Sequence, residues 1–97
     1  MRFNQVSPAI DDQDIKAVNN YLKSGGWITE HKVTKELEEK IKSFTDRKFC
    51  VTVPNGTIAI YLSLLAAGIS NGKRVASPNL TMVATINAAI WANAVPV

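Results

Sequence analysis

The chain has 97 residues and a mass of 10.6 kDa, which is enough for one small domain and too little for a two-domain enzyme. A hydrophobic content of 46% and a charged content of 20% are those of a globular protein and exclude collagen-like and disordered chains. The net charge of +3 comes from basic residues interleaved with acidic ones, so a nucleic acid is not an expected partner.

The first half of the chain predicts two helices. The first helix follows an N-cap at Asp11 or Asp12 and stops at Gly25. Its apolar residues recur at helical spacing: Ile15, Val18 and Leu22. After a loop at 26–29, a second, amphipathic surface helix is expected. Its apolar face consists of Val33, Leu37, Ile41 and Phe44.

The second half of the chain predicts strands that alternate with helices. Strands are expected at 49–53 and 74–77, and a third begins at Val95. The intervening helices are expected over 57–67, closed by a C′ glycine at Gly68, and from 81 or 82 to 92. Such alternation implies an α/β fold, with parallel strands and helices on the faces of the sheet.

Charge is divided unevenly between these halves. Residues 1–48 carry nine Lys and Arg and all eight Asp and Glu, whereas residues 49–97 carry only Lys73 and Arg74. A segment with two charges has little with which to cover a water-exposed surface. The second half is therefore typical of a protein interior, and we expect the natural domain to continue past Val97.

Neither targeting nor redox chemistry is indicated by the sequence. Cys50 has no disulfide partner or metal-ligand companion and is expected to be a buried, inert strand residue of a cytoplasmic protein. The N-terminus lacks the apolar run of a signal peptide, and the stretch 58–69 is too short to cross a bilayer. No membrane association is expected.

The best local candidate for ligand binding is the turn Asn55-Gly56-Thr57-Ile58 between a predicted strand and a helix. A glycine there lets a phosphate approach the backbone, while the amides of the first helical turn and the helix dipole favour an anion. A tight turn with Thr57 as N-cap is an equally good interpretation of these residues. The turn is neither a Walker loop nor a dinucleotide fingerprint.

Several motifs in order resemble the opening of the DegT/DnrJ/EryC1/StrS aminotransferases, pyridoxal-phosphate enzymes that aminate nucleotide-linked keto-sugars. These motifs lie at residues 7–10, 26–29, 33–41, 53–60, 65–69 and 80–88. The resemblance covers the whole chain but only the first part of such an enzyme. It implies that residues 1–97 form the N-terminal part of the three-layer large domain of the aspartate-aminotransferase (type I PLP) fold, with a mostly parallel sheet. The rest of that domain and a C-terminal small domain would be absent.

The resemblance also implies roles for individual residues. Gly56, Thr57 and Ile58 match the family's Gly-Thr-Ala turn, in which the Thr side chain and the last two amides hold the cofactor phosphate. Met82 falls where the family usually has an aromatic residue stacked on the pyridine ring, and a core methionine is the alternative.

Trp27 and Thr29 match a loop that in the family lies near the sugar-nucleotide site, often across the dimer interface. A hydrophobic loop anchor is the alternative for Trp27. His31 replaces a glycine that is common after this loop and is expected to be a surface residue rather than a general base.

Transamination also needs a Schiff-base lysine and an acid paired with the pyridinium nitrogen, which the family places beyond this region. No catalytic or metal-binding residue is therefore assigned, and the chain alone is expected to be inactive. The implied parent enzyme transfers an amino group from glutamate or glutamine to a nucleotide-linked keto-sugar. A non-catalytic binding or regulatory homologue of the same fold, and a truncated product that self-associates, are the alternatives. A homodimer or higher self-association is expected.

Overall fold

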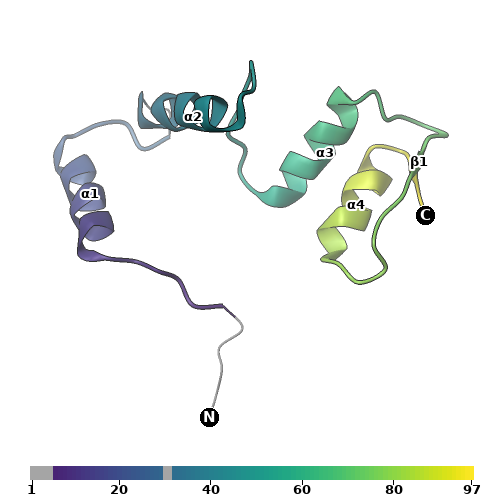
Figure 1. The fold of residues 1–97 in the computed structure, drawn as a ribbon, viewed down its shortest axis with the longest axis horizontal. Helices are drawn as coiled ribbons and strands as arrows, with labels where there is room; N and C mark the ends of the chain where they lie inside the picture. The colour runs from purple at the N-terminus through teal and green to yellow at the C-terminus, as the bar shows by residue number, and fades with distance from the viewer. Residues whose placement is uncertain (1–5, 30–31) are drawn as a thin grey trace, which may run out of the picture. The chain divides into compact units, whose positions relative to one another are not determined.

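The computed structural model describes residues 6–29 and 32–97. The chain divides into two compact units, Met1–Cys50 and Val51–Val97, and each is described by itself (Figure 1). Among its described residues, the first unit contains helices α1 (Asp12–Lys23) and α2 (Lys32–Thr45). The second unit contains α3 (Gly56–Ala66), β1 (Arg74–Val75), α4 (Val83–Trp91) and β2 (Val95–Pro96).

Helix α1 forms where the sequence predicts it, with Asp11 as its N-cap. The Asp11 carboxylate accepts hydrogen bonds from the amides of Gln13 (2.8 Å) and Asp14 (3.0 Å). The Asp14 carboxylate in turn accepts from the Asp11 amide at 3.0 Å, which completes a capping box. Gly25, at φ +69°, takes the left-handed conformation that ends the helix.

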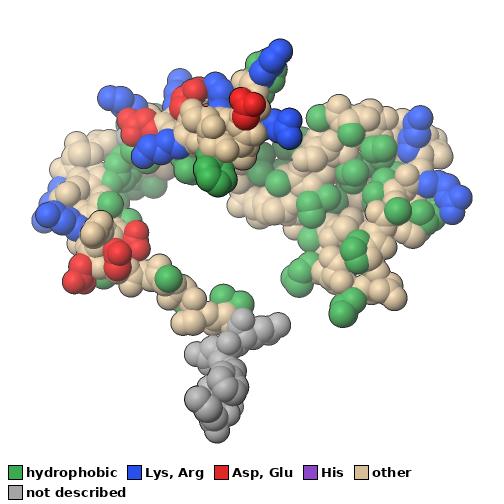
Figure 2. Space-filling model, viewed as in Figure 1, with side chains coloured by type: hydrophobic (Ala, Val, Ile, Leu, Met, Phe, Trp, Pro, Cys, Tyr) green, Lys and Arg blue, Asp and Glu red, His purple; other side chains and the backbone are tan. Residues whose placement is uncertain are grey.

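Helix α2 also confirms its predicted position and amphipathic character. The exposure of the side chains on its apolar face ranges from 43% at Ile41 to 88% at Phe44. Lys42 forms an ion pair of 2.8 Å with Glu39 one turn earlier. Figure 2 shows the charged side chains gathered over the two helices of this unit. An exposed pair of this kind adds little to the stability of α2.

The second unit is built on the predicted parallel strand pairing. Strands β1 and β2 are parallel neighbours, with Arg74 opposite Val95. The ladder continues at its carboxyl end, where the Val97 amide donates to the Val75 carbonyl and the Ser77 amide to the Val97 carbonyl, both at 2.9 Å. Helix α4 supplies the crossover between the two strands, as parallel pairing requires.

Both helices of this unit end in the same hydrogen-bond pattern. After α3, the Ile69 amide donates to the Leu64 carbonyl at 2.9 Å, and Gly68 adopts φ +76°. After α4, the Ala94 amide donates to the Ala89 carbonyl at 3.0 Å, and Asn93 adopts φ +54°. These are Schellman ends, in which asparagine can replace glycine at the left-handed position. The predicted C′ glycine at Gly68 is thus confirmed.

The interior of the second unit is made of small side chains. Helix α4 packs against both α3 and β2. The buried hydrophobic residues are Ala88, Ala89, Ala92 and Ala94, none more than 8% exposed. At the end of α4, the Trp91 ring lies nearly perpendicular to the Tyr61 ring, at 85°, with centroids 6.1 Å apart. Larger apolar residues of this unit remain exposed to solvent, for example Leu62 at 42% and Val83 at 66%. The interior-like composition is therefore not matched by burial among the described residues.

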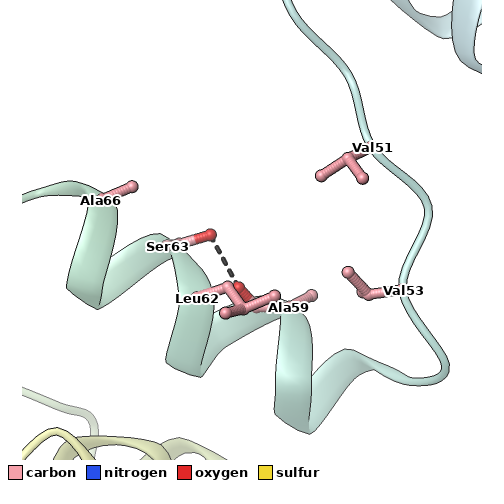
Figure 3. A pocket seen from close by; sticks show the side chains of 6 residues that line it. All are labelled: Val51, Val53, Ala59, Leu62, Ser63 and Ala66. Atoms are coloured by element: carbon pink, nitrogen blue, oxygen red, sulfur yellow. Dashed lines mark hydrogen bonds between the residues drawn. The ribbon is translucent and has the colours of Figure 1, made fainter.

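The predicted strand at 49–53 is wrong. The described sheet consists of β1 and β2 and includes none of these residues, and a strand forms only where a ladder partner lies alongside. Phe49 is 90% and Val51 73% exposed, and Cys50 is half-buried rather than buried. Figure 3 shows Val51 and Val53 facing α3 across an open apolar pocket.

The close packing of α4 predicts a strong size limit at its buried positions. Ala88→Leu should destabilise the second unit by about 1–3 kcal/mol, because no space exists at a side chain that is fully buried. Urea unfolding followed by Trp91 fluorescence, in a Trp27→Phe background, measures this. The exposed residue Ala66 provides the control, since Ala66→Leu should change stability by no more than about 0.5 kcal/mol. Equal effects of the two substitutions would contradict the packing.

Candidate functional site

The turn that precedes α3 is organised by Asn55. This residue has extended backbone angles (φ −165°, ψ +169°), and its side-chain oxygen accepts a hydrogen bond of 3.0 Å from the Ile58 amide. Its carbonyl oxygen accepts from the Ala59 amide at 3.1 Å. Asn55 is therefore the N-cap. The interpretation with Thr57 as N-cap is wrong, since Thr57 already lies within the first helical turn.

The first turn of α3 offers polar donors to a ligand. The amides of Gly56 and Thr57 have no recorded hydrogen-bond partner among the described residues, as is usual for the first amides of a helix. A Cβ built on Gly56 would meet nothing within 4 Å, so the backbone here is open to approach. The Thr57 side chain is half-buried and adds a hydroxyl group. The arrangement suits an anion, because these N–H groups lie at the positive end of the helix dipole.

The amide of Ile58 differs from its two predecessors. It already donates to the Asn55 side chain, so an anion at this amide would have to share or displace that oxygen. Sequence reasoning missed this competition. The available signal was an asparagine three residues before Ile58, which is the spacing of an N-cap and the amide that it binds.

Met82 lies at the start of α4 and is 75% exposed. The helix begins at Val83, slightly later than predicted, and Met82 makes no side-chain cap hydrogen bond. Instead, the hydroxyls of Thr81 and Thr85 are 3.1 Å apart across the first turn. The exposure of Met82 does not support its alternative role as a core methionine. Figure 1 shows α3 and α4 running the same way, so their first turns lie at one end of this unit.

The other two predicted site residues belong to the first unit. Trp27 is 73% exposed and Thr29 is also exposed. The indole of Trp27 is therefore no buried anchor of the loop. The loop is held through its main chain instead, because the Tyr21 hydroxyl donates a hydrogen bond to the Trp27 carbonyl. His31 lies outside the described residues.

Residues 6–29 and 32–97 contain no helix that is long and apolar enough to span a bilayer. Over the same ranges, no three His, Cys, Asp or Glu side chains are grouped so that they could hold a metal ion.

Comparison with known proteins identifies the chain's relatives. The sequence model of the DegT/DnrJ/EryC1/StrS aminotransferase family matches residues 8–97, and the chain belongs to this family. It is 42% identical over 90 residues to the UDP-4-amino-4-deoxy-L-arabinose--oxoglutarate aminotransferase of Shewanella sediminis. It is 33% identical over 90 residues to the GDP-perosamine synthase of Vibrio cholerae. Each match covers 93% of this chain but only 23% and 24% of the respective relatives.

Solved structures extend this likeness to the fold. An aminotransferase from Psychrobacter cryohalolentis superposes with a TM-score of 0.82 at 25% identity, over 93% of this chain and 23% of that one. The PLP form of Spr1654 from Streptococcus pneumoniae superposes with a TM-score of 0.81 at 32% identity, over 93% of this chain and 23% of that one. The chain thus has the α/β fold of the corresponding part of type I PLP aminotransferases, to which the parallel β1–β2 pair belongs.

The Asn55 cap of α3 is expected to stabilise the second unit. Asn55→Ala should destabilise the second unit by about 1 kcal/mol, because the Ile58 amide loses its acceptor. Asn55→Asp keeps an oxygen at the same place and should retain most of the stability. Urea unfolding of both variants, again followed by Trp91 fluorescence, distinguishes these outcomes. A loss as large for Asn55→Asp as for Asn55→Ala would rule out the capping role.

Proposed function

We propose that residues 1–97 form the N-terminal portion of the cofactor-binding large domain of a PLP-dependent sugar aminotransferase. The observation that carries this proposal is the first turn of α3, where a family motif coincides with two main-chain amides available to an anion. In the parent enzyme, an amino group would pass from glutamate or glutamine to a nucleotide-linked keto-sugar. The names of the two curated relatives, which contain UDP- and GDP-linked sugars, support this substrate class.

The cofactor phosphate fits the first turn of α3. We expect the amides of Gly56 and Thr57 and the Thr57 hydroxyl to bind it first, since the Ile58 amide is already hydrogen-bonded to Asn55. Ile58 would join the site if the phosphate displaced the Asn55 oxygen. No charged side chain is needed for this step, because main-chain N–H groups and the helix dipole favour a phosphate by themselves.

The remaining predicted residues would orient the reactants. When bound, PLP supplies an electron sink for moving the amino group. The exposed thioether of Met82 can lie against a ring face, where an aromatic residue is usual in the family. Trp27 and Thr29 would contact the sugar nucleotide. The Schiff-base lysine and the acid at the pyridinium nitrogen would come from outside residues 1–97, so the chain alone would not catalyse the reaction.

A second candidate is a non-catalytic homologue that keeps the fold for binding or regulation. The methionine in place of the usual aromatic residue favours it, since ring stacking would be weaker. Both candidates keep the cofactor phosphate at α3. A lone, unpaired cysteine supports a cytoplasmic location for either protein, and the nucleotide-sugar substrate supports it further for the enzyme.

The open backbone at Gly56 provides a test of cofactor binding. Gly56→Ala should leave the fold intact, because the added Cβ meets nothing within 4 Å, but should weaken PLP binding by about 10-fold by obstructing the phosphate. Equilibrium dialysis of PLP against the chain, with inorganic phosphate as competitor, measures the effect.

Position 57 supplies a second test of the same site, with its own matched control. Thr57→Val removes the hydroxyl and should weaken binding, whereas Thr57→Ser keeps it and should bind as the unsubstituted chain does. Ser63→Ala, later in the same helix, should have no effect on binding. Unchanged PLP affinity in both Gly56→Ala and Thr57→Val would place the phosphate elsewhere.

The exposed apolar side chains predict self-association, and we expect a dimer or a larger species. Leu80 is 92%, Val83 66% and Ile90 52% exposed, and burial of such residues against another copy is favourable. Analytical ultracentrifugation should find species larger than 10.6 kDa that also bind a hydrophobic dye. A stable monomer that leaves the dye unbound would contradict this expectation.

A further inference from the structure

The loop that carries Trp27 is attached to the end of α1 by a side chain. The hydroxyl of Tyr21, in the last turns of that helix, donates a hydrogen bond to the main-chain carbonyl of Trp27. The two residues are six apart in sequence, so the contact closes the segment between them into a ring. The contact depends on the tyrosine hydroxyl, because a side chain without a hydroxyl would leave the carbonyl without this donor.

A second set of hydrogen bonds shapes the same turn. Ser24 caps α1, and its hydroxyl donates to the Tyr21 carbonyl at 2.7 Å. The Gly26 amide donates to the Ser24 hydroxyl at 3.4 Å, which is a weak contact. Between them, Gly25 takes φ +69°, a conformation that reverses the chain toward the helix. The turn thereby returns the backbone to Tyr21, where the hydroxyl can reach it.

The ring of Tyr21 is partly shielded from water. It is half-buried and lines an apolar pocket together with Val18 of α1 and Val33 of α2. A tyrosine with an apolar body and one polar tip is well suited to such a position, because burial of the ring orients the hydroxyl. The hydrogen bond from the Tyr21 hydroxyl to the Trp27 carbonyl, here named the tether, thus links the loop to a residue that lines this apolar pocket.

The tether fixes the backbone of the loop and leaves its side chains available. Trp27 is 73% and Ile28 79% exposed, so neither side chain holds the loop by burial. A loop with such exposed side chains would otherwise sample many conformations, and ordering it on binding costs affinity. One hydrogen bond at the Trp27 carbonyl reduces that cost before any ligand arrives.

We propose that Tyr21 is a positioning residue for substrate binding, whose hydroxyl pre-orders the loop so that Trp27 and Thr29 can contact a sugar nucleotide. This inference rests on the proposed function, which assigns those two residues to the substrate. Tyr21 acts through the main chain of the loop and does not itself touch the substrate. Its removal should therefore weaken substrate binding and leave the chemical step unchanged.

The first experiment measures the tether itself and needs no activity. In a Trp91→Phe background, Trp27 is the sole tryptophan, and its fluorescence anisotropy decay reports the motion of the loop. Tyr21→Phe removes only the hydroxyl and should increase the amplitude of the fast, nanosecond component. Tyr61→Phe removes the only other tyrosine hydroxyl, from α3, and should leave the decay unchanged. Circular dichroism verifies that all variants keep their helices. An identical decay for Tyr21→Phe and its parent would overturn the proposal.

The second experiment measures the consequence in the full-length aminotransferase. Tyr21→Phe should raise the KM for the nucleotide sugar by about 2- to 10-fold, the worth of one hydrogen bond, with kcat unchanged. Tyr61→Phe should alter neither constant. A looser loop with an unchanged KM would refute the positioning role while leaving the proposed function intact. If the unsubstituted enzyme aminates no nucleotide sugar, the proposed function fails instead, and the anisotropy still decides whether the tether exists.

Discussion

The second unit depends on the close approach of α4 to both α3 and β2. Such an approach is possible only where side chains are small, and all the buried hydrophobic residues are alanines. Alanine also has the highest helix propensity, so Ala88 and Ala89, which lie within α4, both permit the packing and favour the helix. This contact, together with the parallel β1–β2 ladder, gives α3 a fixed place in its unit. The amides at the start of α3 can then serve as a preformed anion site.

A single hydrogen bond determines which amides at the start of α3 are available to an anion. Because the Asn55 side chain binds the Ile58 amide, the turn presents Gly56 and Thr57 as its first donors. The cap has two opposing consequences. It stabilises the helix whose dipole favours an anion, and it occupies an amide that the family resemblance assigns to the cofactor phosphate. Under the proposed function, cofactor binding and helix capping would therefore be coupled at this turn.

The two units use their polar groups differently. In the first unit, hydroxyl and carboxylate side chains cap α1 and tie the following loop to it, as Asp11, Tyr21 and Ser24 show. In the second unit, main-chain groups form the strand ladder and both helix C-terminal ends, and the charged side chains are only Lys73 and Arg74. A site made of main-chain amides suits this second unit, since it binds an anion without a buried charge that would need compensation.

The sequence by itself determined the helices, because their signals are local. The capping box at Asp11, the spacing of apolar residues in α2 and the left-handed glycine at Gly68 all act within a few residues. The turn at Gly56–Ile58 could be identified in the same way.

Only the tertiary structure decided what depends on distant partners. Residues 49–53 have the composition of a strand, yet a strand requires a neighbouring ladder that the described sheet does not provide. The choice between Asn55 and Thr57 as N-cap is local, but both residue types are good caps, so the backbone angles at Asn55 were needed to decide it. The tether from Tyr21 to the Trp27 carbonyl depends on the path of the turn, which no residue pattern specifies.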